Sequence, residues 1–228
     1  MANDLAVEAA GLSRRYARRW ALVDVALRVP RGSALMVAGR NGSGKSTLLR
    51  VLATAIRPTR GSARVAGFDL VADPDDVRRK TALLGHASYT YDALTALENL
   101  RITARFLRRP HTREALRAVL DDVGLAERAD DAVETFSAGM RRRLALGRVL
   151  LQDAEVVLLD EPYGQLDPPG FRLVDRLLGR LREGGRSVLM ATHLLERGAG
   201  LCDDALVLET GRVVWAGPAA DLPAQGVT

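Results

Sequence analysis

Short apolar runs alternate with longer helical patterns along most of the chain. Apolar stretches near 21–29 and 33–38 predict strands, and KSTLLRVLATAI, which starts at Lys45, has the spacing of an amphipathic helix. EVVLLD (155–160) and SVLMAT (187–192) are short continuous apolar runs, which are typical of buried parallel strands. This alternation predicts an α/β fold with a mainly parallel sheet.

The middle and the end of the chain have different patterns. From about Thr95 to Leu151 the pattern is mostly helical, and ALVLETGRVVWAG predicts two short strands around Thr210 and Gly211. We expect these two strands to close a minor sheet. With no internal repeat or low-complexity linker, the sequence predicts one domain over 1–228. In it, about 1–94 and 152–228 form a core with an antiparallel β subdomain, and about 95–151 form an inserted helical subdomain.

Composition narrows the possible locations and partners. No apolar run approaches the roughly 18 residues needed to span a bilayer, and Asp4 and Glu8 interrupt the region where a secretory signal would be apolar. Cys202 is the only cysteine, so we expect a reduced thiol in the cytosol. The net charge is +5, but the arginines are scattered, which predicts a solvated surface and no nucleic-acid partner. Lysine occurs only at 45 and 80, which draws attention to Lys45.

The segment GRNGSGKST follows a predicted strand and opens a predicted helix, as a phosphate-binding loop does. Glycines let backbone N–H groups approach phosphate oxygens, Lys45 adds a positive charge, and the Ser46 hydroxyl can bind Mg²⁺. This predicts ATP or GTP binding. The predicted nucleotide contacts here are Gly39, Arg40, Asn41, Gly42, Ser43, Gly44, Lys45, Ser46 and Thr47.

EVVLLDEP places two carboxylates at the end of a buried strand. Ligands of open α/β sheets bind at that edge. Asp160 can hold Mg²⁺ through water, and Glu161 can accept a proton from the water that attacks the γ-phosphate. We therefore predict that Glu161 is the catalytic base.

FSAGM, residues 136–140, narrows the class of nucleotide-binding protein, and its Ser137 stands 18 residues before Glu155. Ser137 can cap the following helix, and Gly139 allows close backbone approach, which together make a second anion-binding helix end. The segment resembles the signature of ABC transporter ATPase subunits. With the other motifs in order, the resemblance extends from Tyr16 to Gly217.

This resemblance implies further roles. It implies that Gln165-Leu166-Asp167 is the D-loop, with Asp167 near nucleotide, and that His193 is the switch histidine beside the reacting phosphate. Tyr16 resembles the aromatic residue that stacks on adenine, although Trp20 or a packing role for Tyr16 stays open. The basic run Arg141–Arg143 is expected to form a solvated helix face without chemistry.

One position departs from the family pattern. The family has a glutamine after the strand that here reads TALLGH, and this chain has His86 there, or Ala87 if the loop differs by one residue. Magnesium contact and coupling to the permease, both ascribed to that loop, are therefore in doubt. His86 can still donate or accept a hydrogen bond, and a purely structural role is equally open.

The segment LLGHASYTYDALTALENLRI resembles the ATP-binding subunit of the haem exporter of cytochrome c maturation. That resemblance implies ATP and Mg²⁺ as cofactors, a haem-exporter permease as partner, and a place on the cytoplasmic face of the inner membrane. It also implies a second copy of the chain, arranged head to tail so that each signature covers the nucleotide of the other. The alternatives are the ATPase subunit of a drug, lipid or polysaccharide exporter and an ABC ATPase that acts on ribosomes or nucleic acid.

Overall fold

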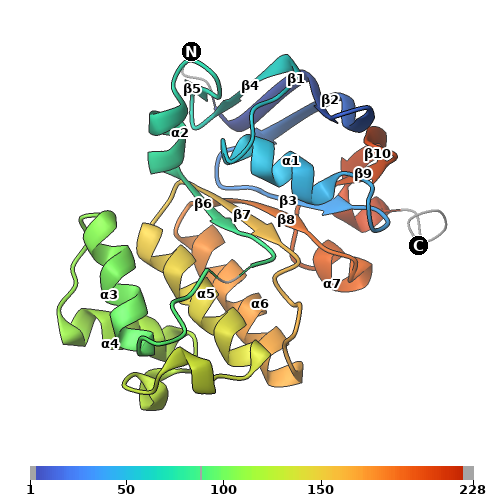
Figure 1. Cartoon of the computed structure of the whole chain (residues 1–228). Coiled ribbons are helices and arrows are strands. Elements are labelled where there is room, and N and C mark those ends of the chain that lie inside the picture. Colours follow the sequence, from blue (N-terminus) through green and yellow to red (C-terminus); the bar gives the residue numbers. More distant parts are fainter. Residues whose placement is uncertain (1–3, 88, 223–228) are drawn as a thin grey trace. The chain divides into compact units, whose positions relative to one another are not determined.

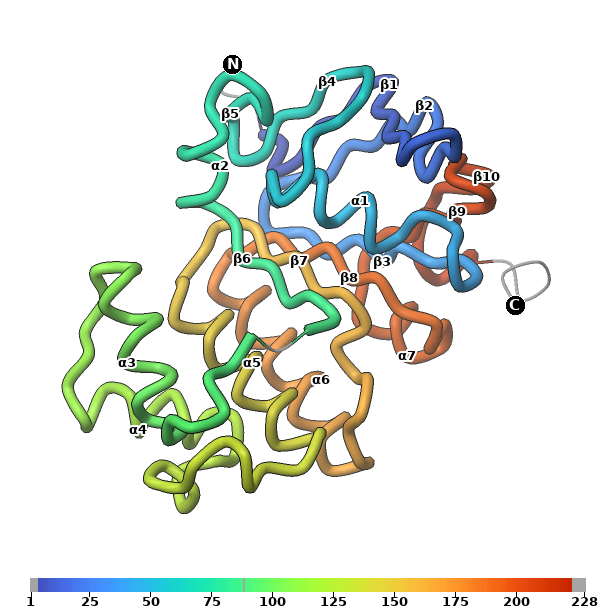
Figure 2. Tube along the Cα trace, viewed as in Figure 1, coloured from blue at the N-terminus to red at the C-terminus, as the bar shows by residue number. Residues whose placement is uncertain are grey.

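The computed structural model describes residues 4–87 and 89–222, and these form two compact units. Unit 1 contains residues 4–83, 154–162 and 177–222, and unit 2 contains residues 84–87, 89–153 and 163–176. Figures 1 and 2 trace the chain through its labelled elements. In the part of the chain that the structure describes, no helix is long and apolar enough to cross a membrane.

Unit 1 contains a four-stranded antiparallel sheet in the order β2-β1-β4-β5. The strands are β1 (Leu5–Tyr16), β2 (Arg19–Pro30), β4 (Arg60–Val65) and β5 (Phe68–Asp69). The pairing of β1 with β2 has several register shifts, among them one between Ala9 and Leu12. Such irregularities break the strict alternation of buried and exposed positions. The antiparallel β subdomain was predicted, but β1 itself was not.

The second sheet of unit 1 has the order β10-β9-β3-β8-β7-β6. Its strands are β3 (Ala34–Ala38), β6 (Thr81–Leu84), β7 (Val156–Asp160), β8 (Ser187–Ala191), β9 (Asp204–Glu209) and β10 (Arg212–Pro218). Strand β3 is parallel to β8 and β9, and β7 is parallel to β8. This confirms the predicted mainly parallel sheet.

The predicted C-terminal hairpin is present, but the prediction that it closes a minor sheet was wrong. Strand β9 pairs with β10 in antiparallel register and with β3 in parallel register. The hairpin therefore extends the main sheet. Residues 205–207 of β9, which pair with β3, are buried, because the strand lies inside the sheet rather than at its edge.

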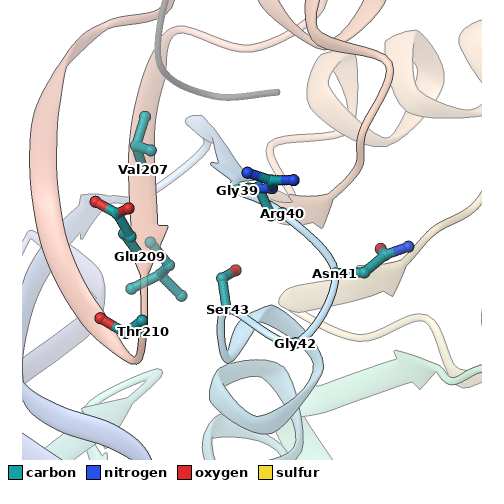
Figure 3. A pocket seen from close by; sticks show the side chains of 9 residues that line it. Gly39, Arg40, Asn41, Gly42, Ser43, Val207, Glu209 and Thr210 are labelled. Atoms are coloured by element: carbon teal, nitrogen blue, oxygen red, sulfur yellow. The ribbon is translucent and has the colours of Figure 1, made fainter.

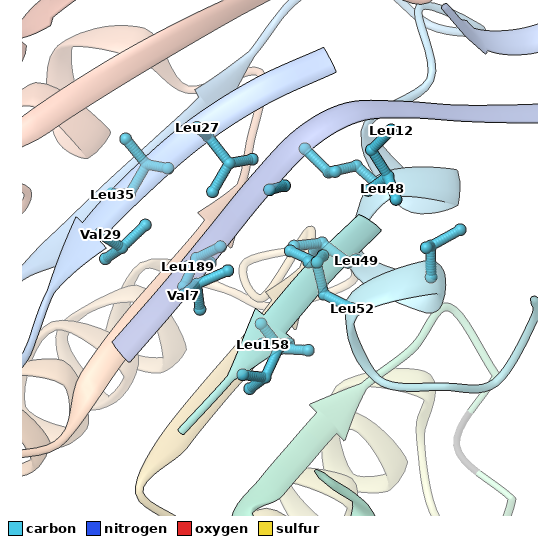
Figure 4. Packing of buried hydrophobic residues seen from close by; sticks show 14 of the residues in the cluster. Val7, Leu12, Leu27, Val29, Leu35, Leu48, Leu49, Leu52, Leu158 and Leu189 are labelled. Atoms are coloured by element: carbon cyan, nitrogen blue, oxygen red, sulfur yellow. The ribbon is translucent and has the colours of Figure 1, made fainter. Parts of the chain in front are cut away.

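One hydrophobic cluster connects both sheets of unit 1 with helix α1 (Lys45–Leu52). Leu48, Leu49 and Leu52 form the buried face of α1, and Figure 4 shows them beside Leu12 of β1 and Leu158 of β7. A fully buried leucine contributes about 1.5–3 kcal/mol relative to an exposed one. The helix that follows the phosphate loop is thus fixed to the sheets. The other helices that lie wholly in unit 1 are α2 (Pro74–Lys80), α7 (Leu195–Ala199) and the short 3₁₀ helix Ala219–Asp221.

Unit 2 is mainly helical. It contains α3 (Ala96–Phe106), α4 (Arg113–Asp122), α5 (Ala138–Gln152) and two 3₁₀ helices, Ala126–Arg128 and Val133–Thr135. Helix α6 (Pro168–Glu183) begins in this unit and ends in unit 1. Each of the first three helices starts at a hydroxyl cap: Thr95, Thr112 and Ser137 accept a hydrogen bond from the backbone three residues on. Local sequence therefore fixes where these helices begin.

Candidate functional site

The predicted phosphate loop connects β3 to α1 and lies close to β9. Gly39 has φ 137°, and a Cβ atom there would lie 2.2 Å from the carbonyl oxygen of Leu208. Backbone atoms cannot rotate away, so a larger residue would push the loop off the sheet. Glycine at this position is what allows the loop to turn directly above the strand end.

Lys45, the first residue of α1, folds back into the loop. Its Nζ donates hydrogen bonds to the carbonyl oxygens of Gly39 (2.5 Å) and Arg40 (3.1 Å), and only 6% of the residue is exposed. Burial lowers the pKa of Lys45, and the nearby carboxylates of Glu161 and Asp160 oppose that shift. A buried ammonium group at a helix start is suited to bind a phosphate oxygen.

The loop also carries a buried hydroxyl group without a hydrogen-bond partner among the described residues. Ser43 Oγ is almost fully buried and makes no such bond. Ser43 is one of the residues that line a cavity of about 300 Å³ between the loop and the end of β9, lined on the β9 side by Val207 to Thr210 (Figure 3). An unpaired buried hydroxyl is costly, so its presence beside the loop fits a ligand that accepts hydrogen bonds, such as a phosphate. Arg40, Asn41 and Gly42 form the exposed tip of the loop.

Ser46 and Asp160, the two predicted magnesium ligands, lie next to each other. Ser46 Oγ donates a 2.9 Å hydrogen bond to Asp160 Oδ1, and Asp160 is 2% exposed. Hydroxyl and carboxylate oxygens are hard donors of the kind that Mg²⁺ prefers. Within the described residues no group of three or more His, Cys, Asp or Glu side chains can hold a metal, so Mg²⁺ here would also need phosphate and water ligands. The donor set therefore fits a magnesium ion that arrives with a nucleotide.

Glu161 and His193 lie at the carboxyl ends of the neighbouring strands β7 and β8. The Glu161 N–H donates to the carbonyl oxygen of Ala191 (2.8 Å), which holds the residue at the strand end. His193 Nδ1 is 2.8 Å from Glu161 Oε2. In the tautomer with the proton on Nδ1, the imidazole donates to the carboxylate. Glu161 has φ 49°, an uncommon conformation for a residue other than glycine.

The two candidate adenine-stacking residues occupy the end of the β1–β2 hairpin. Tyr16 is 42% exposed and Trp20 is 38% exposed. The Arg14 guanidinium lies 4.7 Å from the Tyr16 ring centre, and Arg15 and Arg60 lie 5.5 and 5.4 Å from the Trp20 ring centre. These cation–π contacts orient both rings. Both residues remain candidates for the adenine contact.

The signature and the D-loop meet within unit 2. Ser137 caps α5 by accepting a 3.2 Å hydrogen bond from the Met140 N–H. A Cβ atom on Gly139 would lie 3.0 Å from the carbonyl oxygen of Gln165, so the backbone of the signature nearly touches the D-loop. The helix start at Ser137 leaves unpaired backbone N–H groups that can bind an anion.

Asp167 is held from two sides. Its Oδ1 accepts hydrogen bonds from the Gly170 N–H and from Arg143, each at 2.9 Å. The Gly170 N–H, followed by Arg143, lowers the pKa of Asp167 and keeps it charged. Arg143 thereby ties helix α5 to the D-loop. Sequence reasoning missed this contact.

The expectation of a solvated face at Arg141–Arg143 was wrong. Arg142 is 6% exposed and donates to the carbonyl oxygen of Gly85 (2.7 Å). Arg141 donates to the carbonyl oxygens of Val133 (3.3 Å) and Glu134 (3.2 Å). Guanidinium groups can be buried when backbone carbonyl oxygens accept hydrogen bonds from their N–H groups. A partner 57 residues away in sequence leaves no local signal.

His86 lies after β6 in an exposed bend of unit 2. Its predicted contact with nucleotide or permease stays a prediction. Thr47 lies on the first turn of α1 and is half-buried. Together, the phosphate loop, the paired carboxylates and the histidine at the carboxyl edge of a parallel sheet define a phosphate-loop nucleoside triphosphatase.

Comparison with known proteins identifies the family. The family model "ABC transporter" matches residues 22–164, and the chain belongs to this family. It is an ATPase that couples ATP hydrolysis to transport. The chain is 36% identical over 219 residues to the daunorubicin/doxorubicin resistance ATP-binding protein of Streptomyces peucetius, covering 95% of this chain and 66% of that protein. It is 34% identical over 219 residues to the Nod factor export ATP-binding protein I of Rhizobium johnstonii, covering 93% and 69%.

A solved structure supports the fold. The chain is similar to a dimeric ATP-binding cassette in a post-hydrolysis state bound to ADP and Pi, with a TM-score of 0.84 and 26% identity. The match covers 93% of this chain and 98% of that chain. The predicted α/β fold of an ABC ATPase is thereby confirmed.

Proposed function

We propose that this chain is the ATPase subunit of an ABC exporter for a drug-like or lipid-like molecule, acting with a separate membrane permease. Two relatives support the export role, since their names specify daunorubicin/doxorubicin resistance and Nod factor export. The observation that carries the ATPase part is the 2.8 Å contact between Glu161 and His193 at the same sheet edge as the phosphate loop. We treat residues 1–228 as one ABC ATPase domain with its helical segment at about 95–151.

In this mechanism the backbone of the phosphate loop and Lys45 bind the phosphates. Glu161 accepts a proton from the attacking water, and His193 holds the Glu161 carboxylate through Nδ1. Ser46 and Asp160 would hold Mg²⁺, which neutralises phosphate charge when it is bound. Strands β7 and β8 fix these side chains before nucleotide arrives, which lowers the cost of positioning them.

A second copy of the chain completes the site in this proposal. One chain offers one phosphate loop and one signature, each an anion-binding helix end. A two-fold, head-to-tail dimer would place Ser137 and Gly139 of one copy against the γ-phosphate bound by Lys45 of the other. The ATP-binding cassette with a similar fold is dimeric, which supports a dimer of this chain.

An aromatic groove in unit 2 is the proposed docking site for the permease. Tyr89, Tyr91 and Phe106 are 74%, 59% and 85% exposed and line one cavity of about 370 Å³. The partly buried Arg148 lies at the same cavity and donates to Thr103 Oγ1 (3.2 Å). Clustered exposed aromatic side chains mark interaction surfaces, whereas scattered ones do not. Docking there would place the chain on the cytoplasmic face of the inner membrane.

The groove can be tested by copurification. We expect a tagged chain to retain its permease in detergent-solubilised native membranes, and a Phe106→Ser, Tyr89→Ser double variant to lose it. Val214→Ser is the matched control, because Val214 is 55% exposed but lies on β10 in unit 1. If the double variant copurifies as much permease as the control, this docking site is wrong.

His86 offers a second test of coupling. If its loop contacts the permease, His86→Ala should change ATPase activity in the assembled complex more than in the isolated chain. Equal and negligible effects in both would leave His86 a structural role.

Haem export for cytochrome c maturation is the second candidate, supported by the likeness of residues 83–102. The two functions predict different phenotypes of a deletion strain. The drug or lipid exporter predicts greater sensitivity to amphipathic drugs such as daunorubicin, with normal haem-stained c-type cytochromes. The haem exporter predicts loss of c-type cytochromes while b-type cytochromes remain, because only the former need haem attachment outside the cytosol.

A further inference from the structure

The turn of the C-terminal hairpin is bonded directly to the phosphate loop. The Gly211 N–H donates a 2.9 Å hydrogen bond to the carbonyl oxygen of Ser43. The Gly211 carbonyl oxygen accepts a 2.8 Å hydrogen bond from the Val23 N–H of β2. One glycine thus connects the phosphate loop with the hairpin that carries Tyr16 and Trp20.

The space around Gly211 excludes any side chain. Gly211 has φ 80°, and a Cβ atom there would lie 2.7 Å from the carbonyl oxygen of Ala21 and 3.1 Å from Leu22 Cα. Both atoms belong to the backbone of β2. The same Ala21 oxygen would lie 2.5 Å from a Cβ atom on Gly44, the N-cap residue just before helix α1. The turn, β2 and the phosphate loop are therefore packed backbone against backbone.

The other residue of the turn is strained. Thr210 has φ 45°, and a β-branched residue rarely adopts this conformation. Two-residue hairpin turns with positive φ at both positions favour Asn-Gly or Asp-Gly. Strain of this kind persists when the surroundings impose it. Here the two hydrogen bonds of Gly211 supply that constraint.

The bond to Ser43 also orients the loop. A trans peptide is planar, so its C=O and N–H point in opposite directions. When Gly211 holds the Ser43 carbonyl toward the turn, the Gly44 N–H must point the other way. We infer that the Thr210–Gly211 turn is a positioning element of the phosphate loop, which sets the direction of the loop N–H groups that receive ATP phosphates. The inference rests on the proposed role of the loop in ATP binding.

The test compares two Gly→Ala variants. Gly211 and Gly67 both have positive φ, 80° and 89°, but a Cβ atom on Gly67 would meet nothing within 4 Å. Gly67→Ala therefore reproduces the backbone strain without the clash. We expect Gly211→Ala to weaken binding of a fluorescent ATP analogue with Mg²⁺ about tenfold or more, with kcat at saturating ATP within about threefold of wild type. Gly67→Ala should bind as wild type does.

Two results would overturn the inference: normal ATP affinity in a folded Gly211→Ala protein, or equal loss of affinity in Gly67→Ala. Hydrogen exchange on the wild-type chain covers the case in which Gly211→Ala does not fold. ATP should slow amide exchange in a peptide spanning 205–213 but not in one spanning 62–70, and unchanged exchange at 205–213 would also refute the inference. If Lys45→Ala binds ATP normally, the proposed phosphate loop has failed instead.

Discussion

The imidazole of His193 and the carboxylate of Glu161 are hydrogen-bonded in the same chain, with 2.8 Å between Nδ1 and Oε2. The two residues differ in environment, since the Glu161 side chain is 21% exposed and the His193 side chain is 65% exposed. The carboxylate is fixed by the sheet, whereas the imidazole lies at the surface. A proton acceptor held in this way is oriented before substrate binds.

The contact between Glu161 and His193 predicts that two variants lose ATP hydrolysis but keep ATP affinity. Glu161→Gln preserves shape and removes the proton acceptor, so we expect ATP affinity near wild type and hydrolysis reduced about 100-fold or more. His193→Ala should lower kcat while it retains ATP affinity, because it removes the contact that orients Glu161. Phosphate release and nucleotide binding, measured on each purified variant, give the two values separately. Near-normal turnover in Glu161→Gln would exclude it as the base.

The local parts of this site were predictable from sequence because each is contiguous. The phosphate loop needs one strand, six loop residues and one helix start, and the carboxylates follow one apolar run. Strand β1 was missed because register shifts, such as the one between Ala9 and Leu12, disturb its period of two. The pattern of one short segment cannot reveal such pairing.

Contacts between distant segments were not predictable. Strand β9 pairs with β3, and Leu206 lies opposite Val37, far away in sequence. The turn residues predicted the hairpin, but they did not predict which sheet the hairpin joins. Arg142 was expected to be solvated, because its basic run gives no information about the distant carbonyl oxygen to which it donates a hydrogen bond. Contacts of this kind, including the hydrogen bond from Gly211 to Ser43, can be found only from the three-dimensional structure.

Breaking the ion pair between Arg143 and Asp167 should disturb the D-loop but leave the phosphate loop unchanged. Arg143→Met keeps an unbranched apolar stem and removes the charged guanidinium, so ATPase activity should fall about threefold to tenfold with unchanged ATP affinity. Arg143→Lys should recover part of the activity. Arg128→Met is the matched control, since Arg128 forms an exposed ion pair with Asp131 in the same unit. Equal activity of Arg143→Met and the control would contradict a positioning role.

The depressed pKa of Asp167 also sets a pH range for this contact. The Gly170 N–H and Arg143 favour the charged carboxylate, so the folded pKa lies below the ordinary aspartate value. The contact is then complete above the ordinary aspartate pKa and is lost as pH falls through the lower folded value. The ratio of wild-type to Arg143→Met activity should therefore stay constant from pH 6 to 8. A ratio that changes over this range would contradict the assignment.

Cys202 should be chemically inert in the folded protein. Burial raises the pKa of its thiol to about 12, and only the thiolate is a strong nucleophile. We expect very slow reaction with a thiol-specific reagent at pH 8 and reaction of one equivalent after denaturation. Fast labelling of native protein at pH 8 would show that the thiol is accessible and ionised.

The head-to-tail dimer predicts complementation between two inactive variants. Lys45→Ala damages the phosphate loop, and Ser137→Arg damages the signature, so each homodimer has two broken sites. In a mixed dimer the two lesions fall on the same site, and the other site is intact. Mixing the two proteins should therefore restore part of the ATPase activity.

Ser137→Arg also removes the cap of α5, which costs about 1 kcal/mol. Thr112→Arg, which removes the equivalent cap of α4, controls for that loss and should keep its activity. If mixed dimers form but stay inactive, either the signature does not act in trans or the two sites cannot work separately. ATP-dependent dimerisation of Glu161→Gln, measured by light scattering, tests the dimer itself, because a strictly monomeric protein at saturating ATP would rule the dimer out.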